Sequence, residues 1–218
     1  MKSRLSLLGR SFLLIVFLYP ALTCGQELKP VLLPAPQTDG GKPLMQVLKA
    51  RHSTREFSSE KLSPQVLANL LWAAFGINRP DTGKRTAPSA MNWQEIDIYV
   101  ALPEGLYVYD AKGHKLTPIL AEDARSAAGT QPFVKDAPVN LIYVADLAKT
   151  GKSSAEERDF YTAADVGFIA QNVYLFCASE GLAVVVRGSV DRVALAKLMK
   201  LRPNQKVLLA QTVGYPKK

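Results

Sequence analysis

The chain has 218 residues, a formal net charge of +8 and 48% hydrophobic residues, which is typical of a globular protein and excludes a disordered one. Two cysteines and two histidines argue against a disulfide-rich scaffold and a structural zinc site. The basic excess is spread along the chain, so it favours an anionic small ligand or an anionic membrane surface over nucleic acid.

Residues 1–25 are predicted to be a signal peptide. Lys2, Arg4 and Arg10 precede an apolar run over residues 12–19, and small or polar residues follow. A basic start, a short apolar stretch and a small-residue exit are typical of secretory signals. The run is shorter than the ~20 residues that a membrane-spanning helix needs. We therefore expect an exported, periplasmic protein, with a retained membrane anchor as the alternative.

Cleavage after Gly25 leaves a mature chain of 193 residues with a net charge of +5. Cys24 leaves lipidation as an alternative, although its neighbours fit the lipoprotein pattern poorly. The mature chain then has one thiol, Cys177, whose apolar neighbours predict a buried and inert side chain.

Residues 26–41 are rich in Pro and Gly and predict an extended lead-in to a single domain over residues 42–218. A helix is expected over residues 43–50. A second helix is better marked, because Ser63 can cap it, Pro64 suits its first position and Gly76 suits its exit. A polar loop over residues 78–92 follows.

Alternating or β-branched residues predict strands in the middle of the chain, at 96–100, at 106–109 and 115–119 around a turn, and at 139–144. Further on, the sequence predicts a helix over 156–180 ended by Gly181, a strand over 182–186, a helix from Asp191 through Leu201, and a strand over 207–213. Helices and strands mix without a regular βαβ repeat, which favours an α+β layered fold. Neither a glycine-rich dinucleotide fingerprint nor a phosphate-binding P-loop is present.

The long helix is the most informative element. From Ala163 to Ala178 only Asp165, Gln171 and Asn172 interrupt the apolar residues. A helix that is apolar all round must be covered on all sides. We expect it to be central to the fold and shared with a second subunit, with its polar residues satisfying contacts to neighbouring helices.

Four segments in order resemble the nitroreductase family of flavin enzymes and span residues 51–216. They are Arg51-His52-Ser53-Thr54-Arg55-Glu56-Phe57, Pro88-Ser89-Ala90-Met91-Asn92-Trp93-Gln94, Val186-Arg187-Gly188 with Asp191, and Val213-Gly214-Tyr215-Pro216. The resemblance implies a central, mostly antiparallel sheet flanked by helices, a long apolar helix at a dimer interface, and noncovalently bound FMN.

By this resemblance, Arg51, His52 and Ser53 hold the phosphate and ribityl chain, and Arg55 lies at the pyrimidine edge of the flavin. A guanidinium suits the phosphate dianion and the negative charge of a reduced flavin. The alternative is that these arginines form surface ion pairs with Glu56 or Glu60.

Further cofactor contacts are expected from three other places, of which the resemblance implies the first. Pro88, Ser89, Ala90 and Asn92 form a loop donated by the other subunit; the alternative is an ordinary turn before a strand. Gln131 contacts the flavin ring. Arg85 could add to the phosphate side.

Two departures from the family pattern concern Arg187 and Lys217. The resemblance places the backbone amides of Arg187 and Gly188 near flavin N5. The family often has Glu where Arg187 stands. The Arg187 side chain either favours an anionic substrate or points to solvent. Family members commonly continue past the Gly-Tyr-Pro segment with basic residues, and here Lys217 either supplies that charge or frays.

The resemblance implies an FMN-dependent oxidoreductase, nitroreductase-like or of the azoline-oxidising branch, that cycles electrons between a donor and a small-molecule acceptor by a ping-pong mechanism. The flavin carries the chemistry, so no nucleophilic side chain and no metal is expected. Export separates the enzyme from cytoplasmic nicotinamide cofactors, which leaves the donor and the direction of reaction open. The alternatives are a non-catalytic exported flavin-binding protein and an interaction domain that keeps only the scaffold.

Overall fold

The computed structural model describes residues 27–218; the predicted signal peptide lies outside the described residues. A sheet of seven strands runs through the molecule in the order β1-β6-β5-β4-β7-β9-β8, and neighbouring strands are antiparallel. The strands are β1 (Val31–Leu32), β4 (Ile96–Leu102), β5 (Gly105–Asp110), β6 (Lys115–Leu120), β7 (Val139–Asp146), β8 (Ala183–Arg187) and β9 (Gln205–Gly214).

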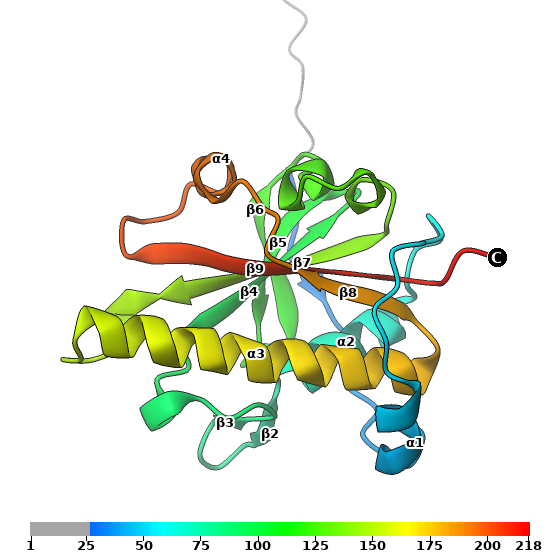
Figure 1. The fold of residues 1–218 in the computed structure, drawn as a ribbon, viewed down its shortest axis with the longest axis horizontal. Helices are drawn as coiled ribbons and strands as arrows, with labels where there is room; N and C mark the ends of the chain where they lie inside the picture. The colour runs from blue at the N-terminus through cyan, green and yellow to red at the C-terminus, as the bar shows by residue number, and fades with distance from the viewer. Residues whose placement is uncertain (1–26) are drawn as a thin grey trace, which may run out of the picture.

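Helices cover both faces of this sheet. One face carries three of them, α1 (Leu44–Ala50), α2 (Pro64–Phe75) and α3 (Ala155–Glu180), and the other carries α4 (Arg192–Leu198) with the 3-10 turns η2 (Arg125–Ala128) and η3 (Pro132–Val134) (Figure 1). The predicted α+β fold with a mostly antiparallel sheet is confirmed.

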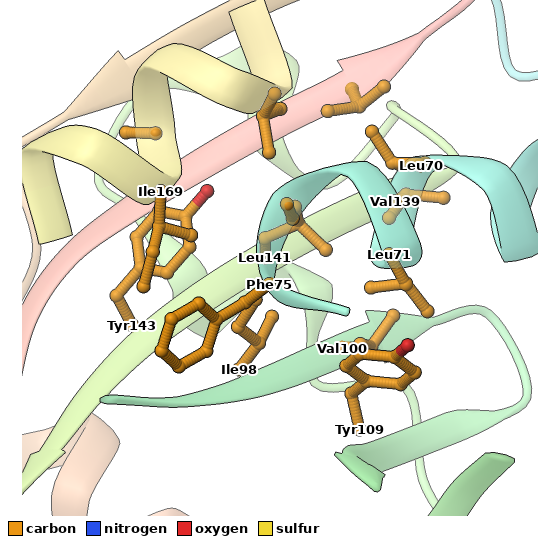
Figure 2. Close-up of a cluster of buried hydrophobic side chains, with 14 of the residues drawn as sticks. Leu70, Leu71, Phe75, Ile98, Val100, Tyr109, Val139, Leu141, Tyr143 and Ile169 are labelled. Atoms are coloured by element: carbon orange, nitrogen blue, oxygen red, sulfur yellow. The ribbon is translucent and has the colours of Figure 1, made fainter. Parts of the chain in front are cut away.

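Strand β7 lies in the middle of the core, and all eight of its residues are buried. Leu141 and Tyr143 face α2 and α3, whereas Ile142 and Val144 face α4 and η2. Figure 2 shows the first of these clusters, where side chains of α2 and α3 meet those of β4, β5 and β7. Period-2 alternation therefore builds two cores, one on each face of the sheet.

Local signals in the sequence set the helix ends. The Ser63 hydroxyl accepts from the Val66 amide at 3.2 Å at the start of α2. Gly181 ends α3 in the left-handed region with φ 72°. Gly76 ends α2 for a different reason: its φ is −69°, and an added Cβ would lie only 2.5 Å from the Trp72 side chain.

The structure differs from the sequence predictions in three places. Helix α4 ends at Leu198 rather than Leu201, because Lys200 turns to φ 52° and the Leu201 amide closes back onto the Ala196 carbonyl. The expected polar loop contains a short hairpin of β2 (Ile77–Arg79) and β3 (Lys84–Arg85), and the lead-in supplies β1. Strands of two or three residues are too short to leave a period-2 pattern in the sequence.

Helix α3 is covered on only one side within this chain. Val166, Ile169 and Val173 are buried against the sheet and α2. On the outer side Phe160 is 67% exposed and Phe168 is 48% exposed. The chain alone thus leaves uncovered much of the apolar surface that the sequence predicted to be enclosed.

Cys177 on α3 is buried and unpaired, as predicted, and burial raises the pKa of its thiol well above the usual range. A buried thiol with a raised pKa is a weak nucleophile. No helix within residues 27–218 combines the length and the apolar character needed to cross a membrane.

Candidate functional site

The first and third motifs meet around Tyr174 of α3. The Thr54 amide donates to the Val184 carbonyl at 2.9 Å, which fixes the segment after α1 alongside β8. The Tyr174 hydroxyl accepts from the Val186 amide at 3.0 Å and is hydrogen-bonded to the Ser53 hydroxyl at 2.8 Å. Sequence reasoning missed Tyr174, because a single tyrosine in an apolar helix carries no signal of its own.

Arg51 stacks on this tyrosine. Its guanidinium carbon lies 5.2 Å from the centre of the Tyr174 ring, and the side chain is half-buried. Neither Arg51 nor Arg55 takes part in any ion pair within residues 27–218, so the structure does not support the alternative of surface pairs with Glu56 or Glu60. A cation held on an aromatic ring without a carboxylate partner is available for an anionic ligand.

His52 and Arg55 of the first motif are exposed. His52 is hydrogen-bonded through Nδ1 to the Ala50 carbonyl at 2.7 Å, which sets the direction of its ring. Arg55 is exposed and follows Thr54 along the same edge of the molecule. These positions leave both side chains free to reach a ligand near Arg51.

The fourth motif lies beside the first. The Ser58 amide donates to the Tyr215 carbonyl at 2.9 Å, and Phe57 and Pro216 form an isolated antiparallel bridge. The Lys217 amide donates to the Glu56 carbonyl at 3.4 Å, while its side chain is exposed. The backbone of Lys217 is therefore tied next to Arg55 rather than frayed.

The prediction that Arg187 faces either a substrate or solvent is wrong for its side chain. Arg187 is 5% exposed, and its guanidinium donates to the Ala128 carbonyl at 2.8 Å, to Thr212 Oγ1 at 2.8 Å and to Asn140 Oδ1 at 3.1 Å. Burial lowers its pKa to about 10. Arg187 fastens η2 to the sheet, and Gly129 must lack a side chain because an added Cβ would lie 1.8 Å from the Arg187 Nη1.

The backbone after β8 remains accessible. Gly188 is exposed, and Thr130 binds Ser189 through its amide (3.3 Å) and its hydroxyl (2.7 Å). Gln131 follows directly, and its Oε1 is buried with no donor among residues 27–218. A buried amide oxygen without a donor is uncommon in native proteins and indicates a site where a ligand could supply one.

The second motif forms a rigid, strained loop before β4. The Ala90 amide donates to Asp165 Oδ2 at 2.8 Å, and the Ser89 hydroxyl accepts from the Gln94 amide at 2.8 Å. Met91, Asn92 and Gln94 all have positive φ, at 49°, 56° and 49°. Non-glycine residues seldom adopt this conformation, and such strain is concentrated at functional sites.

A buried carboxyl pair anchors this loop. Glu95 is fully buried, its Oε2 accepts from the Ser89 hydroxyl at 3.2 Å, and its Oε1 has no partner among the described residues. Burial, and next the nearby Asp165 carboxylate, raises the pKa of Glu95 to about 7. Sequence reasoning missed Glu95, because a glutamate at the start of a strand resembles an exposed one.

The polar residues of α3 behave largely as predicted. Asp165 binds the Ala90 amide, and Asn172 Nδ2 donates to the Ala73 carbonyl at 3.1 Å, so both satisfy contacts to neighbouring elements. Gln171 is exposed.

The two halves of the predicted site are separated within one chain. Tyr174, in contact with Arg51, and Asp165, in contact with Ala90, stand nine residues apart on α3. This spacing corresponds to about 13 Å along a helix. The structure therefore brings the first, third and fourth motifs together and leaves the Pro88–Gln94 loop apart from them.

Comparisons with known proteins support one assignment. Residues 48–215 match the model of the nitroreductase family. A provisionally named nitroreductase of Methanocaldococcus jannaschii is 33% identical over 181 residues, covering 78% of this chain and 90% of that protein.

Solved structures agree with this. The crystal structure of a provisionally named nitroreductase from Ralstonia eutropha JMP134 has a TM-score of 0.85 and 43% identity, covering 89% of this chain and 92% of that chain. The NADPH:FMN oxidoreductase of Vibrio harveyi has the same fold at 20% identity, with a TM-score of 0.62 and coverage of 80% and 69%. From the sequence matches and the shared fold together, this chain belongs to the nitroreductase family.

Proposed function

We propose that the protein is an FMN-dependent oxidoreductase in which an electron donor and a small-molecule acceptor bind in turn at one flavin. The observation that carries this proposal is the cluster of Arg51, Ser53 and Tyr174 at the edge of β8, where a half-buried guanidinium has no carboxylate partner among the described residues. Family membership and the name of the Vibrio harveyi relative favour FMN as the ligand.

The chemistry of FMN matches the groups present. Arg51 offers a planar fork of donors to the phosphate dianion, with the Ser53 and Tyr174 hydroxyls beside it. Gln131 Oε1 offers an acceptor to a flavin N–H, and the exposed Gly188 leaves room for a flat ring to approach the backbone. Arg55 and Lys217 add positive charge along the same edge.

FMN, when bound, supplies the two-electron transfer. The residues of this chain then bind, orient and tune it. Arg55, placed at the pyrimidine edge, would stabilise negative charge on the reduced ring and raise its reduction potential.

The second half of the site is proposed to come from a second copy of the chain. The outer side of α3 exposes Phe160 and Phe168, and Leu44, Met45 and Met91 are exposed on α1 and η1 (Ala90–Asn92). Gly167 lies on the same outer side, and an added Cβ there would meet nothing within 4 Å. A mid-helix glycine with no steric need inside its own chain is explained by close approach of another helix.

Export to the periplasm is part of the proposal. It rests on the pattern of residues 1–25 alone, which lie outside the described part of the chain. Cell fractionation of a tagged full-length chain tests it; a cytoplasmic protein of unprocessed mass would contradict it.

The test of the cofactor is titration of the chain from residue 26 onwards with FMN and, separately, with riboflavin. We expect tight FMN binding with visible flavin absorbance, and Arg51→Gln should weaken FMN binding by about tenfold or more, because a charge-assisted hydrogen bond contributes roughly 1.5–3 kcal/mol. Riboflavin, which lacks the phosphate, should bind both forms alike.

Lys197→Gln on α4 removes one positive charge from the opposite face of the sheet and serves as the control. An Arg51→Gln protein that binds FMN as tightly as this control would remove Arg51 from the phosphate site. A flavin-loaded protein that neither accepts electrons from any donor nor passes them to quinones or nitroaromatics would identify a flavin carrier instead.

A further inference from the structure

A basic cavity is lined in part by the strained Pro88–Gln94 loop. It has a volume of about 340 Å³ and is lined by Arg79, Lys84, Arg85, Thr86, Ala87, Pro88, Ser89, Asn92 and Gln94. Three of these nine side chains are cationic and none is acidic. None of the three forms an ion pair within residues 27–218.

Arg85 is held rigidly at this cavity. Its Nε donates to Gln94 Oε1 at 2.7 Å, its Nη1 donates to the Phe75 carbonyl at 2.9 Å, and its guanidinium carbon lies 4.9 Å from the centre of the Phe75 ring. No residue in the described part of the chain accepts a hydrogen bond from its Nη2. Burial lowers the pKa of Arg85, and the charges of Tyr109, Asp97 and Asp110 act in the opposite direction.

The same interactions tie the cavity to the loop. Gln94 binds Arg85 through Oε1, and its Nε2 donates to the Asn92 side chain at 3.0 Å and to the Gly83 carbonyl at 3.1 Å. Arg79 Nη2 donates to the Arg85 carbonyl at 2.6 Å, which braces the β2–β3 hairpin. The cationic wall and the loop therefore form one preorganised unit.

A preorganised cation without a counter-charge, beside two more cations, is the arrangement that recognises oxyanions. We propose that this cavity binds the phosphate or carboxylate group of the electron donor or acceptor and so selects anionic substrates. The inference deepens the proposed function, in which the Pro88–Gln94 loop faces the flavin of the other subunit. A ligand anchored here by its anionic group would have its remainder beside that loop.

The cavity differs from the site proposed for the FMN phosphate. That site is built around Arg51 and Tyr174, towards the other end of α3 from the contact between Asp165 and Ala90. The two positively charged regions can therefore be altered independently.

The first experiment measures binding to the mature protein without any turnover. Isothermal titration with pyrophosphate, and separately with benzoate, compares the unaltered protein with Arg79→Gln/Lys84→Gln, whose changes lie at exposed positions. The matched control is Lys112→Gln/Lys152→Gln, which removes the same charge from exposed positions that do not line the cavity. We expect the cavity variant to weaken binding by about tenfold or more and the control to change it less than twofold.

The two anions separate the two sources of the ligand group. Preference for pyrophosphate indicates a phosphate-bearing donor, and preference for benzoate indicates a carboxylate-bearing acceptor. Equal loss of binding in the cavity variant and in the control would overturn the proposal. Such a result would show that anion binding depends on the net charge of the protein and not on the cavity.

The second experiment uses the flavin-loaded enzyme with two acceptors of similar size, para-nitrobenzoate and para-nitrobenzyl alcohol. The cavity variant should raise KM for the anionic acceptor about tenfold at unchanged kcat and leave KM for the neutral one unchanged. Arg85→Lys should give a smaller effect of the same sign, because a lysine keeps the charge without the fork. Equal changes for both acceptors would contradict an anionic subsite.

A third measurement, of FMN and riboflavin binding, distinguishes a substrate site from a site for the cofactor phosphate. If the cavity variant weakened binding of FMN but not of riboflavin, the cavity would hold the cofactor phosphate, and the substrate inference would be wrong. If the unaltered protein bound no flavin at all, the proposed function would fail, while the pyrophosphate titration would still report on the cavity.

Discussion

Glu95 shows how one buried side chain can make the whole protein sensitive to pH. Its pKa rises from an ordinary 4.5 to about 7 on folding, chiefly because of burial. Between these two values the folded chain keeps a proton that the unfolded chain has lost. Stability should therefore fall as the pH rises through this window and level off above it.

The test is the free energy of unfolding as a function of pH. Replacing Glu95 with Gln should remove about 3 kcal/mol of this decline, because the pKa rises from 4.5 to about 7 and each pKa unit corresponds to 1.36 kcal/mol. The variant should then be more stable than the unaltered protein above neutral pH. Glu122→Gln, at an exposed position, is the control and should keep the decline. A Glu95→Gln protein with an unchanged profile would show that the carboxyl ionises freely in the folded state.

Arg187 fixes a loop to the sheet, and its loss should affect stability before activity. Arg187→Ala leaves the Ala128 carbonyl without its donor and opens a cavity beside Phe133. We expect a loss of about 2–4 kcal/mol in the denaturant-unfolding free energy. Arg187→Lys should not restore it, because one ammonium group cannot reproduce the fork that reaches Ala128, Asn140 and Thr212.

Kinetics distinguish this structural role from a substrate contact. A folded Arg187→Ala enzyme should show the same ratio of KM values for para-nitrobenzoate and para-nitrobenzyl alcohol as the unaltered enzyme. A selective rise for the anionic acceptor without loss of stability would place the guanidinium at the substrate.

Individual side chains were the part of the site least accessible from sequence. Motif positions such as Arg51 and Ser89 could be selected, because a residue type in a pattern is visible in the chain. Burial and direction are tertiary properties, which is why Arg187 was misjudged, and why Glu95 and Tyr174 were missed. Their roles appear only when β8, α3 and the loop before β4 are packed together.

Helix α3 carries the clearest prediction among the secondary-structure elements. Gly167 lies on its exposed side, where a Cβ added to the glycine would have no atom within 4 Å. Within one chain Gly167→Ala should stabilise the helix by about 1 kcal/mol. Gly167→Leu should fit equally well in a lone subunit but prevent close approach of a second one.

We therefore expect Gly167→Leu to shift the protein from dimer to monomer in sedimentation experiments, with its circular dichroism unchanged. Lys197→Leu, which adds the same side chain to α4, should remain dimeric. A dimeric Gly167→Leu protein would rule out helix–helix contact at this position.

Long elements were predictable because their signals are redundant. The apolar run of α3 predicts a long helix and Gly181 predicts its end, whereas the capping box of Ser154 and Glu157 that begins it is seen in the structure. The two-residue strands β1 and β3 have no comparable signal in the sequence, because they are strands only by virtue of their hydrogen bonds to β6 and β2. The end of α4 was also not predictable, because the positive φ of Lys200 ends the helix although the helical sequence pattern continues.

For the assembled protein, a cofactor site made from two chains predicts that flavin binding depends on protein concentration. Dilution below the dimer dissociation constant should release FMN, and FMN should raise the thermal midpoint more at low protein concentration. Flavin absorbance and sedimentation measured over the same dilution series check this. A monomer that holds flavin with undiminished affinity would show that one chain completes the site.

The fold as a whole could be predicted further than the site, because an α+β architecture follows from element order and the resemblance to the nitroreductase family implies the antiparallel sheet. The strand order β1-β6-β5-β4-β7-β9-β8 could not, since it depends on which edges meet in space. The separation in space of the Arg51 cluster from the Pro88–Gln94 loop likewise cannot be predicted from the sequence, which shows only the order of the two motifs.

That separation has a genetic consequence. Helix α3 carries both Tyr174, which binds the Val186 amide, and Asp165, which binds the Ala90 amide. In the proposed dimer, a pair of one normal and one mutant chain would have two flavin sites, each with residues from the mutant chain. A mutation that bends α3 should therefore be genetically dominant, because no flavin site in a mixed dimer would be intact.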